Sequence, residues 1–155
     1  IRSPTTTRDA DMLELREAII ARLKDPAIDG IGARVHPRNE FESVAQAGQQ
    51  GPTLFVKFAR MKKVEDTGLR IVSAWDFDWW VVLALRNARQ TPDGLGAGLF
   101  DVSPMLRTVA SRLQGWTPEL PQHRPLEMIS PPDPEYITGL DLIPLAFRCR
   151  QFITT

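Results

Sequence analysis

A run of eighteen residues from Leu69 to Arg86 constrains the fold more than any other feature. Its odd positions are apolar except for Ser73: Leu69, Ile71, Trp75, Phe77, Trp79, Val81, Leu83 and Leu85. Its even positions include two carboxylates, Asp76 and Asp78. Successive side chains of a β-strand point to opposite faces, so an alternation with a period of two is typical of a strand. The pattern predicts one long strand, with both aspartates on the face opposite Trp75 and Trp79.

The length of this run has a further consequence. Fully extended, it would reach roughly 60 Å at about 3.3 Å per residue. A compact domain of this size has a radius of gyration of only about 15 Å. The strand therefore either bends or projects from the body as an arm paired with residues 55–60. An isolated two-stranded hairpin is marginally stable, so a projecting arm favours an oligomer in which a second subunit covers it.

The remaining elements predict one α+β domain over residues 11–155, preceded by a flexible arm over residues 1–10. Apolar residues at three- and four-residue steps predict a helix over 11–24, and Ser103-Pro104 resembles the start of a second helix that ends at Gly115. Two helices are expected on a mostly antiparallel or mixed sheet of four to five strands, with a projecting hairpin. The predicted strands cover residues 31–35, 53–60, 69–86 and 140–153, and the predicted loops cover 36–52, 61–68, 87–99 and the proline-rich 116–135.

Composition excludes some classes of protein. Lys plus Arg equals Asp plus Glu at 19 each, so no net charge attracts nucleic acid or an anionic membrane. No apolar run approaches the roughly 20 residues that span a bilayer, and the chain starts without the apolar segment of a secretory signal. The single cysteine cannot form an internal disulfide. We therefore expect a protein made in the cytoplasm, without a membrane partner or sequence-specific binding of nucleic acid.

Asp76-x-Asp78 is the strongest candidate for chemistry. Two carboxylates on one strand face could chelate a single Mg²⁺ or Mn²⁺, as in a small metal-dependent transferase. The alternative is a solvated strand face, or carboxylates paired with Arg70 and with lysines of the neighbouring strand. The second interpretation requires no cofactor, and we favour it.

The histidines and the cysteine give weaker signals. His36 and His123 lack a nearby second ligand of the kind that zinc requires. Cys149 lies between two arginines, which would lower its pKa if they were close, although a small buried hydrophobic residue in a strand is the simpler interpretation. We predict no catalytic residue, no metal site and no cofactor.

The order of the segments resembles the tail terminator proteins of tailed bacteriophages, especially those of Mu-like phages. An amphipathic helix precedes a strand pair, then a second helix runs into Leu-x-Gly-Trp-x-Pro at residues 113–118, and a strand over residues 140–148 closes the chain. The short motif is the most distinctive part. The resemblance covers roughly residues 11–153. The acidic pair and the tryptophans of residues 75–80 match no pattern of that family.

The resemblance implies a structural virion protein without enzymatic activity. Such subunits form a hexameric ring at the head-proximal end of the tail, cap the tail tube, stop its polymerisation and provide a surface for head attachment. The expected partners are further copies of the chain, the tail tube protein and a head–tail connector or neck protein, with the genome passing through the ring. Candidate interface residues are Met61, Lys62, Lys63, Trp75 and Trp116, although Trp116 could equally pack over the end of the second helix.

Three alternatives to the tail terminator remain open from the sequence alone. A head–tail joining or tail-completion protein would share the same composition and location in the virion. A transferase built on Asp76 and Asp78 would bind a divalent metal ion. A nucleic-acid-binding adaptor would bind DNA in a salt-sensitive manner.

Overall fold

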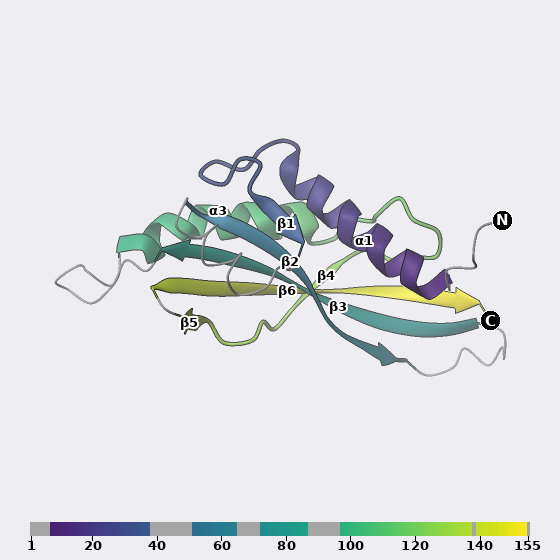
Figure 1. Cartoon of the computed structure of the whole chain (residues 1–155). Coiled ribbons are helices and arrows are strands. Elements are labelled where there is room, and N and C mark those ends of the chain that lie inside the picture. The colour runs from purple at the N-terminus through teal and green to yellow at the C-terminus, as the bar shows by residue number, and fades with distance from the viewer. Residues whose placement is uncertain (1–6, 38–50, 65–71, 87–96, 138, 155) are drawn as a thin grey trace.

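The chain folds into one mixed β-sheet with two helices on one of its faces, seen in a computed structural model (Figure 1). The structure describes residues 7–37, 51–64, 72–86, 97–137 and 139–154. This is the predicted α+β class, with six strands in place of four to five. The two additional strands are three residues long and come from the segment that precedes the last strand.

The sheet has the strand order β1-β2-β3-β6-β4, and β5 also pairs with β6. Only β1 and β2 are parallel; all other pairs are antiparallel. The strands are β1 (Val35–Pro37), β2 (Thr53–Lys63), β3 (Val72–Arg86), β4 (Glu127–Ile129), β5 (Glu135–Ile137) and β6 (Leu140–Thr154), and the helices are α1 (Thr7–Lys24) and α3 (Ala97–Leu113).

The central strand β3 confirms the alternation seen in the sequence. β2 pairs with it from Thr53 to Lys63, and β6 pairs with it along its whole length. Its far half therefore lies in a three-stranded sheet, and the predicted arm with a single partner strand is wrong in this respect. The three long strands twist about one another and extend beyond α3, under the start of α1 (Figure 1). The first three residues of the predicted run lie outside the described residues.

The core lies between the helices and the odd face of β3. Phe77, Trp79, Val81 and Leu83 are all buried there. Above them, α1 contributes the predicted stripe of Leu15, Ile19, Ile20 and Leu23, and α3 contributes Val109 and Leu113. The even positions of β3 face the opposite side, which neither described helix covers (Figure 1).

Both helices start earlier than predicted. α1 begins at Thr7, so the last residues of the predicted flexible arm are helical, and residues 1–6 lie outside the described residues. α3 begins at Ala97, which places Ser103 and Pro104 inside the helix and not at its start. Apolar residues at helical spacing continue on the N-terminal side of Pro104, at positions 99 and 102. This repeat outweighs the start signal, although an internal proline removes a backbone hydrogen bond.

The first and last strands differ in detail from the predictions. The strand predicted at residues 31–35 starts at Val35, where it pairs with β2. The segment 140–153 forms one continuous strand, β6. Pro144 lies opposite Val82 of β3, while on its other side β5 pairs only up to Leu142 and β4 begins at Ala146. The proline therefore occupies the gap between two short partner strands, where its missing N–H costs little.

Candidate functional site: the arginine–aspartate ladder and the far end of the sheet

The open face of the sheet carries a ladder of five charged residues across β2, β3 and β6. Asp78 lies at its centre, with a side chain that is only 4% exposed. Arg148 donates to it from β6, with Nε 2.8 Å from Oδ1 and Nη2 3.2 Å from Oδ2. Arg60 donates from β2, with Nε 2.7 Å from Oδ2. Both carboxylate oxygens of Asp78 therefore accept charge-assisted hydrogen bonds.

Asp76 repeats this arrangement one step along the strand. Arg150 donates to it through Nε at 2.9 Å and Nη2 at 3.3 Å. Arg148 Nε also lies 3.9 Å from Asp76 Oδ2, so this arginine links the two aspartates. Each aspartate stands directly opposite its main arginine in the antiparallel register, Asp76 against Arg150 and Asp78 against Arg148. Cross-strand pairs of opposite charge stabilise a sheet.

A β-bulge brings Arg60 into this ladder. The pairing of β2 with β3 shifts by one residue between Phe58 and Arg60. Without that extra residue Arg60 would lie opposite Phe77, on the buried face. The bulge reverses the direction of the following side chains, which is a known use of this irregularity. The core cluster records the shift, because its β2 residues fall on even positions up to Phe58 and the next one is Met61.

The arginines control the ionisation of Asp78. Burial raises the pKa of its carboxyl group, but the hydrogen bonds and charges of Arg148 and Arg60 outweigh burial and lower the pKa below its ordinary value. The same contact raises the pKa of the Arg148 guanidinium group, since its hydrogen bond to Asp78 stabilises the charged form. Asp78 and Arg148 therefore face each other as a charged pair near neutral pH.

This geometry does not support a metal site at Asp76 and Asp78. Their oxygens already accept hydrogen bonds from guanidinium groups, which a cation would have to displace. Among the described residues no group of three or more His, Cys, Asp and Glu side chains is placed to hold a metal ion. The second sequence interpretation, charge pairing, is confirmed, with partners that the sequence did not indicate. They are Arg60, Arg148 and Arg150, whereas Arg70 lies outside the described residues.

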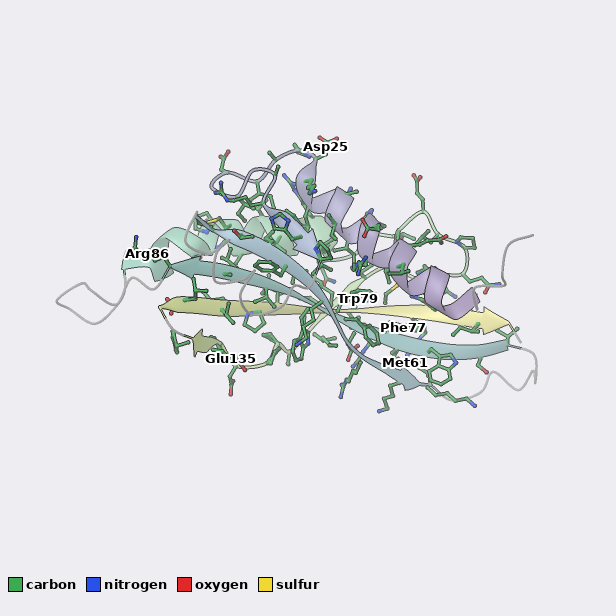
Figure 2. All side chains as sticks on the ribbon, viewed as in Figure 1. Asp25, Met61, Phe77, Trp79, Arg86 and Glu135 are labelled. Atoms are coloured by element: carbon green, nitrogen blue, oxygen red, sulfur yellow. The ribbon has the colours of Figure 1, made fainter. Side chains whose placement is uncertain are left out.

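Four of the five predicted interface residues come together at the far end of β2 and β3. Lys63 lies opposite Trp75, and Met61 lies opposite Phe77. Met61 and Trp75 are half-buried against the core, whereas Lys62 and Lys63 are exposed. Figure 2 places Met61 toward one end of the sheet and Arg86 at the other.

Trp116 lies elsewhere, where the two helices end. It is half-buried against the core, and the Arg22 guanidinium carbon lies 5.2 Å from its ring centroid. Arg22 Nε donates to the carbonyl of Arg112 at 2.9 Å, and Arg112 Nη1 donates in return to the carbonyls of Leu23 and Pro26. Each helix end thus has its carbonyls satisfied by an arginine of the other, which favours Trp116 as a packing residue at the helix end.

Cys149 is a buried core residue on the helix-covered face. Burial raises the pKa of its thiol to about 12, and the thiol donates to the Arg124 carbonyl, with Sγ 3.3 Å from the oxygen. The condition for a lowered pKa is not met, because the side chains of its two arginine neighbours point to the opposite face of β6. The favoured interpretation, a small buried hydrophobic residue in a strand, is confirmed. The histidines are also apart: the His36 ring packs on Phe55, and His123 Nδ1 contacts the Pro121 carbonyl at 2.8 Å.

Comparison with known proteins decides the family. The model of the phage tail terminator protein family matches residues 10–155. The chain belongs to this family. Its members are structural proteins of the phage tail, so this chain is a structural virion protein, as its resemblance implied. Among the helices that the structure describes, none is long and apolar enough to span a membrane.

A chain of one solved structure has a similar fold. The matching chain belongs to a structure titled "Virion of native gene transfer agent (GTA) particle". It is 15% identical, with a TM-score of 0.56, over 89% of this chain and 94% of the other. At this identity the match concerns the fold alone. No curated protein matches the chain.

Proposed function

We propose that this protein forms a ring at the head-proximal end of the phage tail, where it caps the tail tube, ends its polymerisation and offers a surface to the head. The family match over almost the whole chain carries the proposal. The ring contains six copies in the arrangement that the family resemblance implies. The tail tube protein and a neck protein are its other partners, and the ring assembles in the host cytoplasm without enzymatic activity.

The geometry of the sheet supports an assembly role. The three long strands reach past α3 (Figure 1), and β2 ends in the exposed Lys62 and Lys63. Closed rings need two different lateral surfaces on each subunit and a third surface for the tube. We assign the tube or neighbour contact to the end that holds Met61, Lys62, Lys63 and Trp75. We assign Trp116 to packing at the helix ends.

Tube assembly in the presence of the protein tests the function. Purified tail tube protein is polymerised with and without this chain, and electron microscopy measures tube lengths and the position of labelled subunits. Shorter tubes with label at one end are expected. Unchanged lengths, or label along the tube, would contradict the proposal, and label only on purified heads would favour a head–tail joining protein.

A charge variant tests the contact surface within the same assay. The double variant Lys62→Glu/Lys63→Glu is expected to lose capping. Its matched control, Lys24→Glu/Arg86→Glu, makes the same change in charge at exposed sites away from the lysine end and is expected to cap normally. If both variants capped tubes equally well, the lysine end would not be part of the contact with the tube or the neighbouring subunit.

A further inference from the structure

The open face of the sheet is cationic although the chain is neutral overall. We define the ladder face by the eight charged residues in register around Asp76 and Asp78: Lys57, Arg60, Lys62, Asp76, Asp78, Glu127, Arg148 and Arg150. Farther along the same face, Arg86 and Glu135 cancel in charge. Five of the eight are cationic and three are acidic, whereas the whole chain has net charge +0. The rest of the molecule therefore carries a net negative charge. The positive excess lies on one face.

The cationic groups also lie outermost on this face. The side chains of Arg60 and Arg150 are 64% and 46% exposed, whereas those of Asp78 and Asp76 are 4% and 10% exposed. The Nζ of Lys57 lies 5.0 Å from the ring centroid of half-buried Trp80, so apolar area continues next to the charges. A partner that fits this face supplies both carboxylates and an apolar side chain.

The outer side of α1 has this composition. Leu13 is 51% exposed, one of three large exposed hydrophobic residues in the described part of the chain. Glu14 and Glu17 are exposed on the same helix, and residues three and four apart lie on one helix surface. α1 covers the face of the sheet opposite the ladder (Figure 1). The two surfaces therefore lie on opposite sides of one subunit.

We propose that the ladder face of each subunit binds the outer side of α1, around Leu13, Glu14 and Glu17, of the next copy. The inference rests on the proposed function, because it names the lateral contact of the ring. Two different surfaces on opposite sides of a subunit make a head-to-tail contact, which generates a ring when the rotation closes. The contact would place helices on both faces of the sheet, as in other layered folds.

A second copy fits this face better than duplex DNA does. DNA offers no counterpart to the apolar area at Trp80. An exposed leucine flanked by two glutamates supplies both kinds of contact in one helical turn.

Charge reversal on each surface tests the contact by light scattering. The helix variant is Glu14→Arg/Glu17→Arg. The ladder-face variant is Lys57→Glu/Lys62→Glu, which leaves all the described arginine–aspartate pairs in place. Wild type is expected as a ring of about 104 kDa from 17.4 kDa subunits. Each variant alone is expected at the monomer mass, and Lys24→Glu/Arg107→Glu, at exposed helix positions outside both proposed surfaces, is expected to keep the ring.

Mixing the helix variant with the ladder-face variant is the decisive experiment. Each interface between unlike subunits then pairs opposite charges again, so an equimolar mixture is expected to recover the ring mass, as is a single chain that carries all four substitutions. Circular dichroism confirms that each variant is folded. Variants that keep the ring alone, or a mixture that stays monomeric, would overturn the proposal. Loss of binding to a DNA duplex by the ladder-face variant, with its ring intact, would overturn it in favour of DNA.

The capping assay separates this inference from the proposed function. A wild-type chain that stays monomeric at every concentration and still shortens tubes would overturn the lateral contact and leave the function standing. A ring that recovers its mass on mixing but never shortens tubes would support the contact and overturn the function.

Discussion

The two faces of β3 reach the same burial by different means. On the helix-covered face Trp79 is 1% exposed, and on the open face Asp78 is 3% exposed, one residue away. Trp79 is buried by apolar contacts with the helices and neighbouring strands, whereas Asp78 is buried under two arginines. The burial of Trp79 depends on the volume of its apolar neighbours, because apolar packing is non-directional. The burial of Asp78 depends on which residues stand opposite it in the neighbouring strands.

The comparison shows why burial alone does not define a core position in this sheet. A buried aspartate whose oxygens accept hydrogen bonds from solvent-exposed side chains is part of the polar surface of the molecule and not of its folding core. A buried tryptophan belongs to the folding core. The two faces should therefore respond differently to substitution, acid and chemical modification.

Truncation of Trp79 should have the largest effect. Trp79→Ala is expected to lower the free energy of unfolding by about 3–5 kcal/mol, because it leaves a large cavity. Urea denaturation measures the loss. Trp80→Ala, on the open face and only half-buried, is the matched control and should cost clearly less. Equal losses would mean that the two faces contribute alike to the core.

Removal of Asp78 should come second. Asp78→Ala is expected to cost about 2–4 kcal/mol, because it leaves Arg148 without its main partner on the open face. Asp133→Ala removes an exposed carboxylate and should stay within about 0.5 kcal/mol. The pairwise replacement Asp78→Val/Arg148→Val should recover part of the loss, since it removes both charges. A double variant no more stable than Asp78→Ala would show that the pair is not the relevant unit.

Acid should weaken the open face selectively. The folded protein holds Asp78 at a pKa below its ordinary 3.8, so the unfolded chain binds more protons in this range. The stabilisation is therefore complete above about pH 4 and is lost as the pH falls through the lower folded value. Urea denaturation at a series of acidic pH values should show a shallower decline for Asp78→Asn than for wild type. Parallel curves would exclude Asp78 as a source of acid sensitivity.

The smallest expected effect concerns Cys149 on the helix-covered face. With a pKa raised to about 12, its thiol should resist a thiol reagent at neutral pH in the folded state and react fully in urea. Absorbance of the released chromophore measures the reaction. Rapid labelling of the folded protein would show that its arginine neighbours in sequence do act on the thiol.

The sequence alone predicted the features that depend on the regular spacing of apolar residues. Alternation located β3 and separated its aspartates from Trp75 and Trp79, and the three- and four-residue steps located the buried stripe of α1. It did not predict the partners of the aspartates, because a pairing register depends on distant strands. The core positions of β2 change from even to odd numbers at the bulge. This change can be interpreted as a bulge only once Phe77 is known to lie opposite this part of β2.

Two predictions that were wrong concern segments that contain proline. Pro104 looked like the first residue of a helix, yet the apolar repeat on its N-terminal side extends α3 to Ala97. The proline-rich segment before residue 135 looked structureless, yet it supplies β4 to the edge of β6. In both cases contacts made elsewhere in the fold outweigh the local preference of proline.

The ladder also fixes the alignment of β6 against β3. A shift of one residue would turn the apolar side chains of β6 to the wrong face. A shift of two residues would keep every face correct, so packing alone cannot reject it. In one direction that error would place Asp76 opposite Phe152 and Arg148 opposite Trp80, and in the other Asp78 opposite Ala146. Each shift keeps one aspartate–arginine pair and loses the other, so the charges favour the observed alignment of the two longest strands.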